Sequence, residues 1–479
     1  MSFRQQVLSG LYWTGGARLA GQLLSWAITL VVIRLLSPAD YGLIAMAMVF
    51  ASFLTLLGEA GLGAALVQAP KVSAGALRGI FAAVILVDGA LFCVQYAAAP
   101  AVAWFFEEER LIAIIRVLGA QLVLSIFSII PRSLLMREMD FKRPSLIELG
   151  SNVCGSIVIL VLVLTGHGVW SIVLGNIATQ AFSTVAFNVV SPYLKWPDFS
   201  MRDARGLLTF GGQYMVSRML WFFYSQADIF IAGKALGREA LGFYSVAMHV
   251  ASLPVQKISA VLNNVAFPAF AQAQQDREAV RQYLAKSVRL LSVVSFPVLW
   301  GISSVAPELV TVAFGAKWQP AVLPLQTLSL IMPLTLLSPF FNAAYQGLGF
   351  GGIVLRNVLT ATVLMPIAFL VGIQWGLEGL ALAWIIGFPA VFLVNLSRML
   401  PLLGLTVWSI FASMAPALLS SAVMYGAVAG ARELLASRLS DPVLMASLVV
   451  IGVAVYAIMA VSVNRKTLGE ILELRPRRG

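Results

Sequence analysis

Charged residues are scarce in this chain. Only 11% of its 479 residues are Asp, Glu, Lys or Arg, and 60% are hydrophobic, whereas soluble domains carry roughly 25% charged residues. A water-soluble fold cannot hide so much apolar surface, so the composition excludes a soluble enzyme. The net charge of +11 could suggest nucleic acid, but the basic residues lie in short segments between apolar runs, where they orient membrane helices. The sequence therefore predicts a membrane protein that crosses the bilayer many times and binds no nucleic acid.

Cysteine and histidine are nearly absent. The two cysteines, Cys93 and Cys154, both lie in apolar runs, and the two histidines, His167 and His249, are far apart in the chain. Residues so few and so widely spaced form neither a disulfide framework nor a metal site. We therefore expect no metal and no cofactor.

Nucleotide-binding motifs are also missing. The glycine-rich residues 347–352 (GLGFGG) follow no strand and precede no soluble helix, so we interpret them as a turn between two membrane helices. A Walker lysine motif is absent from the sequence. Transport must then be driven by an ion gradient, the membrane potential or cargo mass action, and the sequence leaves open whether a proton or a sodium ion is coupled to it.

Apolar runs long enough to span a bilayer recur along the whole chain. A spanning helix needs about 20 mostly apolar residues, and long alternating strands are absent. We predict an all-α polytopic membrane protein with about 14 transmembrane helices. These cover residues 11–33, 42–66, 80–104, 111–131, 146–165, 169–190, 207–232, 242–268, 290–314, 321–346, 353–373, 376–397, 407–429 and 443–463.

The basic residues predict how these helices are oriented. With the N-terminus inside the cell, 21 of the 32 Lys and Arg residues fall in cytoplasmic segments and eight in outer segments, while Arg18, Arg218 and Lys257 lie inside helices. Short cytoplasmic loops of membrane proteins carry such an excess of positive charge. We therefore predict that both termini are cytoplasmic.

Two parts of the chain repeat each other at a constant offset of 200 residues. The matches pair Arg18 with Arg218, Leu36 with Leu236, Gly42 with Gly242, and Ala47 with Ala247. Repeated halves inside a very apolar chain are typical of transporters that alternate access around a pseudo-twofold axis.

The repeat also suggests a division of the chain. Six predicted helices precede a polar, basic linker at residues 191–205, and the next six fill residues 207–397. We predict two six-helix lobes related by pseudo-twofold symmetry, plus two extra C-terminal helices. The N-lobe and linker occupy residues 1–200, the C-lobe 201–400, the two extra helices 401–464, and a cytoplasmic basic tail 465–479.

Charged residues inside membrane helices are rare and are usually functional or paired. Arg18 and Arg218 occupy equivalent places in the two repeats. A guanidinium keeps its charge in a dry site and binds phosphate oxygens in a bidentate way. We therefore predict an anionic cargo. The candidate binding residues are Arg18, Arg218 and Lys257, and the candidate coupling or gating residues are Glu59, Asp88 and Asp228.

A structural role is the alternative for each of these residues. Arg18 could reach the cytoplasmic headgroups, or pair with Glu59 and lock two helices together. Lys257 could pair with a nearby acid, and Asp228 could make helix contacts at headgroup depth. The aromatic run at residues 221–224 covers every face of a helix, so most of it must serve packing or lipid contact rather than binding sugar.

Three segments carry a family resemblance. They are residues 35–68 (LLSPADYGLIAMAMVFASFLTLLGEAGLGAALVQ), 253–276 (LPVQKISAVLNNVAFPAFAQAQQD) and 306–326 (APELVTVAFGAKWQPAVLPLQ). They resemble bacterial polysaccharide exporters, the lipid-linked oligosaccharide flippases of the multidrug/oligosaccharidyl-lipid/polysaccharide exporter superfamily. Within this family the chain is most similar to the colanic-acid-type exporters.

The resemblance implies a two-lobe fold with a central cavity. It implies a cargo of undecaprenyl-pyrophosphate-linked oligosaccharide, moved from the cytoplasmic to the periplasmic leaflet of the bacterial inner membrane for synthesis of lipopolysaccharide or exopolysaccharide. Membrane lipids and the polysaccharide polymerase machinery are the partners that it implies.

Two other functions remain as alternatives. One is a multidrug exporter of the same superfamily, although a cation-extruding pump would be expected to have an acid where the first predicted helix has Arg18. The other is a membrane glycosyltransferase or ligase. Such an enzyme usually needs a large extramembrane loop, and the longest outer loop predicted here has only about a dozen residues. We therefore expect a transporter and not an enzyme.

Overall fold

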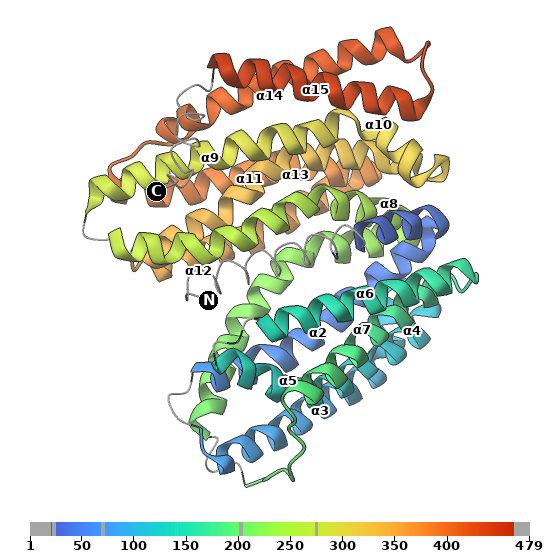
Figure 1. The fold of residues 1–479 in the computed structure, drawn as a ribbon, viewed down its shortest axis with the longest axis vertical. Coiled ribbons are helices and arrows are strands. Elements are labelled where there is room, and N and C mark those ends of the chain that lie inside the picture. The colour runs from blue at the N-terminus through green and yellow to red at the C-terminus, as the bar shows by residue number, and fades with distance from the viewer. Residues whose placement is uncertain are drawn as a thin grey trace, which may run out of the picture. The chain divides into compact units, whose positions relative to one another are not determined.

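The computed structural model describes residue 21 and residues 25–68, 72–138, 140, 142–200, 205–273 and 276–463. All regular structure within these ranges is helical, as predicted (Figure 1). The chain forms two compact units, Met1–Gly242 and Phe243–Gly479.

The first unit is built on a three-helix core of α2, α3 and α5. A short apolar helix, Ser25–Leu35, precedes it. Helix α5 lies against α2, α3 and α7, and α6 pairs with α7 (Figure 1). The helices are α2 (Pro38–Gln68), α3 (Ala74–Phe106), α4 (Arg110–Leu118), α5 (Ala120–Arg137), α6 (Lys142–Leu164), α7 (Val169–Val190) and the first part of α8 (Arg205–Ala273).

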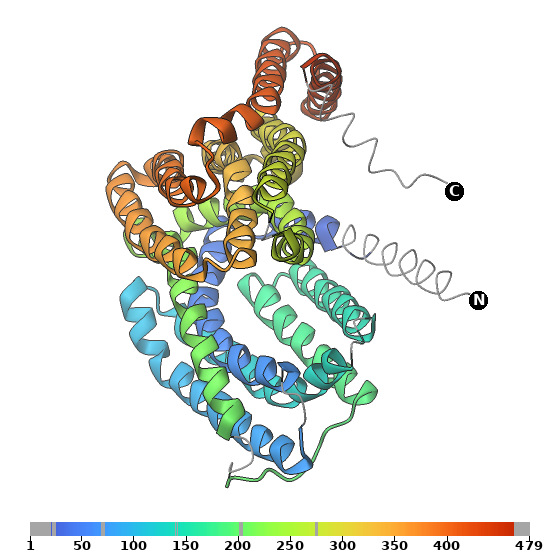
Figure 2. The same ribbon diagram turned by 90° about the vertical axis from the view of Figure 1, so that its left-hand side faces the viewer.

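The second unit packs α9 against α11 and α14, with α13 on the other side of α11. Its last two helices, α14 and α15, form the red hairpin of Figure 2. The elements after α8 are α9 (Arg277–Ser304), α10 (Ala306–Leu309), a π-helical turn (Val310–Phe314), a 3₁₀ turn (Ala316–Ala321), α11 (Val322–Gly347), α12 (Gly351–Gly372), a 3₁₀ turn (Ile373–Trp375), α13 (Gly376–Met399), a 3₁₀ turn (Leu400–Leu403), α14 (Val407–Leu435) and α15 (Asp441–Val463).

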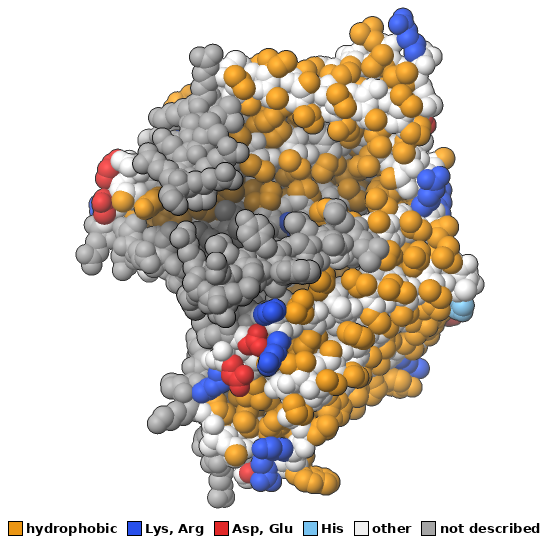
Figure 3. Space-filling model, viewed as in Figure 1, with side chains coloured by type: hydrophobic (Ala, Val, Ile, Leu, Met, Phe, Trp, Pro, Cys, Tyr) orange, Lys and Arg blue, Asp and Glu red, His pale blue; other side chains and the backbone are white. Residues whose placement is uncertain are grey.

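Ten stretches of the described residues are long and apolar enough to cross a membrane. They overlap eleven of the predicted helices, because the stretch Gly351–Leu403 contains both 353–373 and 376–397. The predictions 42–66 and 290–314 are covered only in part, since the stretches there are Pro38–Gly58 and Arg277–Ser304. The remaining three predictions, 11–33, 207–232 and 242–268, fall wholly or partly on residues or side chains outside the description. On the surface of each unit seen in Figure 3, hydrophobic side chains predominate and charged ones are few.

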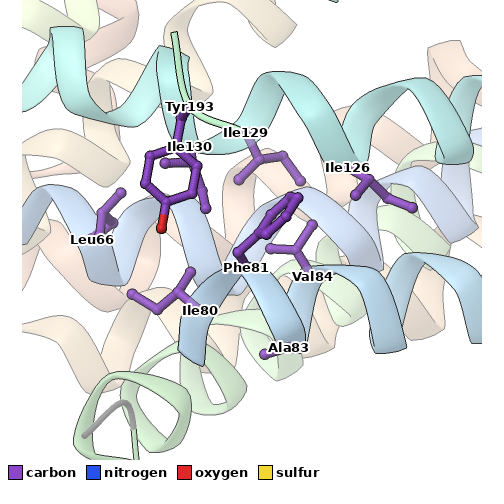
Figure 4. Close-up of a cluster of buried hydrophobic side chains, with 9 residues drawn as sticks. All are labelled: Leu66, Ile80, Phe81, Ala83, Val84, Ile126, Ile129, Ile130 and Tyr193. Atoms are coloured by element: carbon purple, nitrogen blue, oxygen red, sulfur yellow. The ribbon is translucent and has the colours of Figure 1, made fainter. Parts of the chain in front are cut away.

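The start of the predicted linker is docked on the first unit. Tyr193 is buried in a cluster of apolar side chains from α2, α3 and α5, with its ring edge-on to Phe81 at 5.8 Å (Figure 4). Arg78 donates from Nε to the Trp196 carbonyl oxygen at 3.0 Å, and the Asp198 amide donates to the Arg78 carbonyl oxygen at 3.1 Å. These bonds hold residues 193–198 against the first turns of α3.

The predicted helices 207–232 and 242–268 meet at a kink within α8. Helix α8 runs from Arg205 to Ala273, and its single non-helical residue is Gly237, with φ 77° and ψ −178°. A positive φ of this kind is accessible to glycine without a steric penalty. The chain therefore changes direction at Gly237 without a loop.

A reciprocal backbone contact joins α2 and α8 inside the first unit. A β-carbon built on Gly42 would lie 1.6 Å from the Arg238 carbonyl oxygen, and one built on Gly242 would lie 1.8 Å from the Pro38 carbonyl oxygen. The partners obey the same 200-residue offset as the sequence repeat. Such a reciprocal arrangement, in which residue i contacts j and j contacts i, is what a twofold axis produces.

Candidate functional site

Asp88 lies at the junction of the three core helices of the first unit. It is fully buried on α3, and Ser125 of α5 donates from Oγ to its Oδ2 at 2.7 Å. The same Ser125 Oγ is 2.7 Å from the Leu122 carbonyl oxygen. On the α2 side Asp88 Oδ1 rests against Gly58, where an added β-carbon would meet it at 2.3 Å. Asp88 is therefore an ionisable group enclosed by three helices.

The bonds around Ser125 depend on the protonation of Asp88. A hydroxyl carries one proton, so with an ionised Asp88 Ser125 can donate to the carboxylate or to Leu122, but not to both. With a protonated Asp88, the carboxyl can donate to Ser125 while Ser125 donates to Leu122. One proton on Asp88 thus reverses the direction of a buried hydrogen-bond chain.

Asp228 is also buried, with 4% of its surface exposed. It lies on α8, nine residues before the bend at Gly237, and its Oδ1 accepts from the Ile229 amide at 2.9 Å. The two predicted gating acids thus lie on different helices of the first unit, Asp88 on α3 and Asp228 on α8.

The predicted binding residues are only partly within the description. Arg18 lies outside the described residues. Glu59 and Arg218 lie on α2 and α8, but their side chains are not described. Glu59 directly follows Gly58, whose backbone touches Asp88. Lys257 is exposed on the part of α8 that belongs to the second unit.

The aromatic run on α8 packs against α2. Phe53 of α2 lies 5.3 Å from the Phe222 ring and 5.2 Å from the Phe223 ring. Phe222 is buried, whereas Phe223 is 47% exposed. These contacts agree with the packing role that the sequence indicated for most of the run.

The sequence did not predict two clusters of paired acidic and basic side chains. At the end of α3, Glu107 accepts from Lys234 Nζ at 2.7 Å and Glu108 accepts from Arg238 Nη1 at 2.5 Å. The bond and charge of Lys234 hold the pKa of Glu107 below its ordinary value of 4.5. The opposite charges of the two acids and the two basic residues were the available signal in the sequence.

The second cluster lies in the second unit. Arg432 of α14 donates from Nε to Glu308 Oε1 at 2.6 Å and from Nη2 to Glu308 Oε2 at 3.0 Å. Its Nη2 also donates to the Ser304 carbonyl oxygen. The Glu308 side chain is only 7% exposed and that of Arg432 is 26% exposed. This bidentate pair fastens α14 to the segment that joins α9 and α10.

Within the described residues, no three His, Cys, Asp or Glu side chains are grouped as a metal site would require. Cys93 and Cys154 are free thiols.

Comparison with known families gives one match. Residues 31–323 match the model described as polysaccharide biosynthesis protein. The chain is 25% identical over 333 residues to the teichuronic acid biosynthesis protein TuaB of Bacillus subtilis, covering 69% of each chain.

Comparison with solved structures shows the fold. An inward closed structure of the lipid II flippase MurJ matches with a TM-score of 0.78 and 16% identity, over 95% of this chain and all of that one. An inward-facing multidrug resistance transporter of the MATE family, from the multidrug/oligosaccharidyl-lipid/polysaccharide exporter superfamily, matches with a TM-score of 0.61 and 16% identity, over 83% of this chain and 98% of that one.

Proposed function

The chain belongs to the polysaccharide biosynthesis protein family, whose members are membrane transporters of the exporter superfamily and not enzymes, and we propose that it flips undecaprenyl-pyrophosphate-linked oligosaccharide from the cytoplasmic to the periplasmic leaflet of the bacterial inner membrane. The observation that carries this proposal is the family match over residues 31–323, in a chain whose described residues include ten candidate membrane spans.

The transport cycle that we propose is alternating access by two lobes of six helices, with two further helices at the C-terminus and both termini in the cytoplasm. The sequence repeat supports two related lobes. The reciprocal contact of Gly42 and Gly242 supports the same symmetry locally, because its partners obey the repeat offset.

Arg18 and Arg218 are proposed to bind the diphosphate of the cargo, and Lys257 to assist them. The equivalent positions of the two arginines in the repeat support a shared ligand. Two guanidinium groups would match the oxygens of a diphosphate in number and geometry. Glu59 is proposed to neutralise an arginine when the cargo has left.

The test is a leaflet-resolved assay of the lipid-linked oligosaccharide in cells with and without the protein. Without it, the cargo should accumulate on the cytoplasmic side, and wild type but not Arg218→Ala or Arg18→Ala should relieve the block. Arg132→Gln is the matched control, because Arg132 forms an exposed pair with Glu148. Full export by both alanine variants at normal protein levels would exclude the diphosphate site. An unchanged leaflet distribution would instead favour drug export.

Asp88 is proposed to couple transport to protons, since the direction of its hydrogen-bond chain depends on one proton. Replacement of Asp88 with Asn should leave the protein folded, because the amide can donate to Ser125 in the manner of a protonated carboxyl. Cargo movement in Asp88→Asn should lose its dependence on a pH gradient, measured as outer-leaflet cargo in proteoliposomes. Asp228 is proposed as a gating residue near the outer bend of α8.

The control for this prediction is Ser151→Ala. Ser151 is another buried serine, and its hydroxyl donates to the Ile147 carbonyl oxygen within its own helix. This variant should keep the wild-type response to the gradient. Retention of that response by Asp88→Asn would rule out Asp88 as the coupling group, and a response to sodium alone in wild type would assign the coupling to that ion.

A further inference from the structure

Most of the linker forms a strap, residues 191–200, that presents apolar side chains on the outside of the first unit. Leu194 is 75% exposed, Trp196 87% and Phe199 57%. The backbone that carries them is fixed, because the buried Tyr193 ring anchors it in the cluster of Figure 4 and hydrogen bonds hold it on α3. Their exposure is therefore a property of the docked strap.

The ends of α7 and α3 put the strap at the level of the lipid headgroups. It begins directly after α7, a candidate membrane span that ends at Val190, and it bonds to Arg78 in the first turns of α3. Helix α3 has 33 residues and is about 50 Å long at 1.5 Å per residue, whereas a bilayer with its headgroups is about 40–45 Å thick. The first turns of α3 therefore reach the headgroup layer, together with the strap that they hold.

The apolar surface of the strap continues one that belongs to a spanning helix. Phe182, Val185 and Val189 are exposed on α7, and their spacings of three and four residues put them on one face of the helix. An exposed apolar stripe on a spanning helix contacts lipid, since the bilayer core holds no water. Leu194 and Trp196 follow this stripe along the chain and extend the apolar surface into the headgroup layer.

The residue types of the strap favour a lipid surface over a protein partner. Tryptophan is enriched where a bilayer meets water, because its ring is apolar and its N–H is polar. Lys195 is exposed between Leu194 and Trp196, and lysine is depleted from the buried cores of protein interfaces. At a membrane surface the same lysine keeps its ammonium group among the headgroups while its stem covers apolar surface.

The charges around the exposed side chains favour an anionic lipid. Arg78 and Lys195 are both exposed, and Asp198 is the single acid of the strap. The charge of Arg78 acts on Asp198, so that Lys195 carries the excess positive charge of the strap. A basic residue held near an anionic membrane surface strengthens attachment to that surface several-fold.

We propose that the strap is an anchoring surface for anionic phospholipids of the leaflet that the charge distribution predicts to be cytoplasmic. Leu194, Trp196 and Phe199 insert among the headgroups, and Lys195 and Arg78 attract the lipid phosphates. The inference goes beyond the proposed function, because the partner is the bulk phospholipid of the membrane and not the cargo.

The experiment puts a spin label on Leu194→Cys in the full-length protein, with Cys93 and Cys154 replaced by alanine, in nanodiscs that contain no cargo. Collisions of the label with oxygen, which concentrates in lipid, are compared with collisions with a water-soluble nickel complex. The ratio of oxygen to nickel collisions should be higher than for a label on Arg277→Cys, an exposed position at the start of α9. It should also be higher in phosphatidylglycerol than in phosphatidylcholine.

Two substitutions test the apolar and the charged part of the anchor separately. Trp196→Ser should lower the ratio in both lipids, and the strap should stay docked because Arg78 bonds to the backbone of Trp196. Lys195→Gln should remove the increase in phosphatidylglycerol and leave the ratio in phosphatidylcholine unchanged. Trp408→Ser is the matched control, since Trp408 is 78% exposed but lies on α14 of the second unit, and it should change neither ratio.

Three results would overturn the proposal. A label at Leu194 that is as open to nickel as the label at Arg277 would show that the strap lies in water. A label protected from both reagents would show that protein covers the strap, such as a second copy of the chain. Equal ratios in the two lipids, or no effect of Lys195→Gln, would exclude a preference for anionic lipid. Because no cargo is present, this assay is independent of the leaflet assay, and either proposal can fail alone.

Discussion

Replacement of Gly42 or Gly242 with alanine is expected to lower the stability of the folded protein strongly. The added β-carbon would lie 1.6 Å from the Arg238 carbonyl oxygen in one variant and 1.8 Å from the Pro38 carbonyl oxygen in the other. Both obstacles are backbone atoms, so no side-chain rotation can relieve the overlap, and α2 and α8 must move apart. We expect each variant to lose about 3 kcal/mol or more, at the upper end of the cost of overpacking. Folded yield and the midpoint of thermal unfolding are the measurements.

Gly430→Ala in α14 is the control, because a β-carbon on Gly430 meets nothing within 4 Å. In an open helical position this change should be neutral or stabilise by about 0.4–1 kcal/mol. The two contact variants should also resemble each other, since the contact is reciprocal. Wild-type stability in Gly42→Ala, or a large difference between Gly42→Ala and Gly242→Ala, would contradict the described contact.

Loss of one partner from the pair of Glu308 and Arg432 is expected to give the second large effect. Arg432→Met would leave a carboxylate that is 7% exposed without the guanidinium that holds both of its oxygens. Breaking a buried ion pair in this way costs about 3–5 kcal/mol, and we expect the lower end because the arginine is 26% exposed. A double variant, Glu308→Leu with Arg432→Met, should recover part of the loss, since no unpaired charge remains. Thermal unfolding of the full-length protein measures both.

The comparison is the exposed pair of Arg132 and Glu148, whose side chains are 45% and 47% exposed. Arg132→Gln should cost no more than about 1 kcal/mol, and the contribution of this pair should shrink as salt is added. The buried pair should be nearly insensitive to salt. Equal losses for Arg132→Gln and Arg432→Met would show that burial does not set the strength of the pair of Glu308 and Arg432.

Apolar run length was enough to predict most helices, but not their joints. The turn at 347–352 is confirmed, because α11 ends at Gly347 and α12 begins at Gly351. The predicted helices 207–232 and 242–268 lie on the two sides of the kink at Gly237 within α8. Hydropathy averages over such single positions and therefore cannot detect them.

The candidate site shows the same limit. Asp88 could be identified from sequence because a carboxyl in an apolar run is conspicuous, whereas its partner Ser125 could not, because hydropathy does not determine how each helix is rotated.

The reciprocal glycine contact has a consequence for the origin of the chain. Each half supplies both a glycine and a carbonyl oxygen, Gly42 and Pro38 from one, Gly242 and Arg238 from the other. A single half would therefore be self-complementary at this surface, and two identical copies could make the same contact twice. The contact is the one expected between two identical copies of one half, and the duplication has preserved it within a single chain.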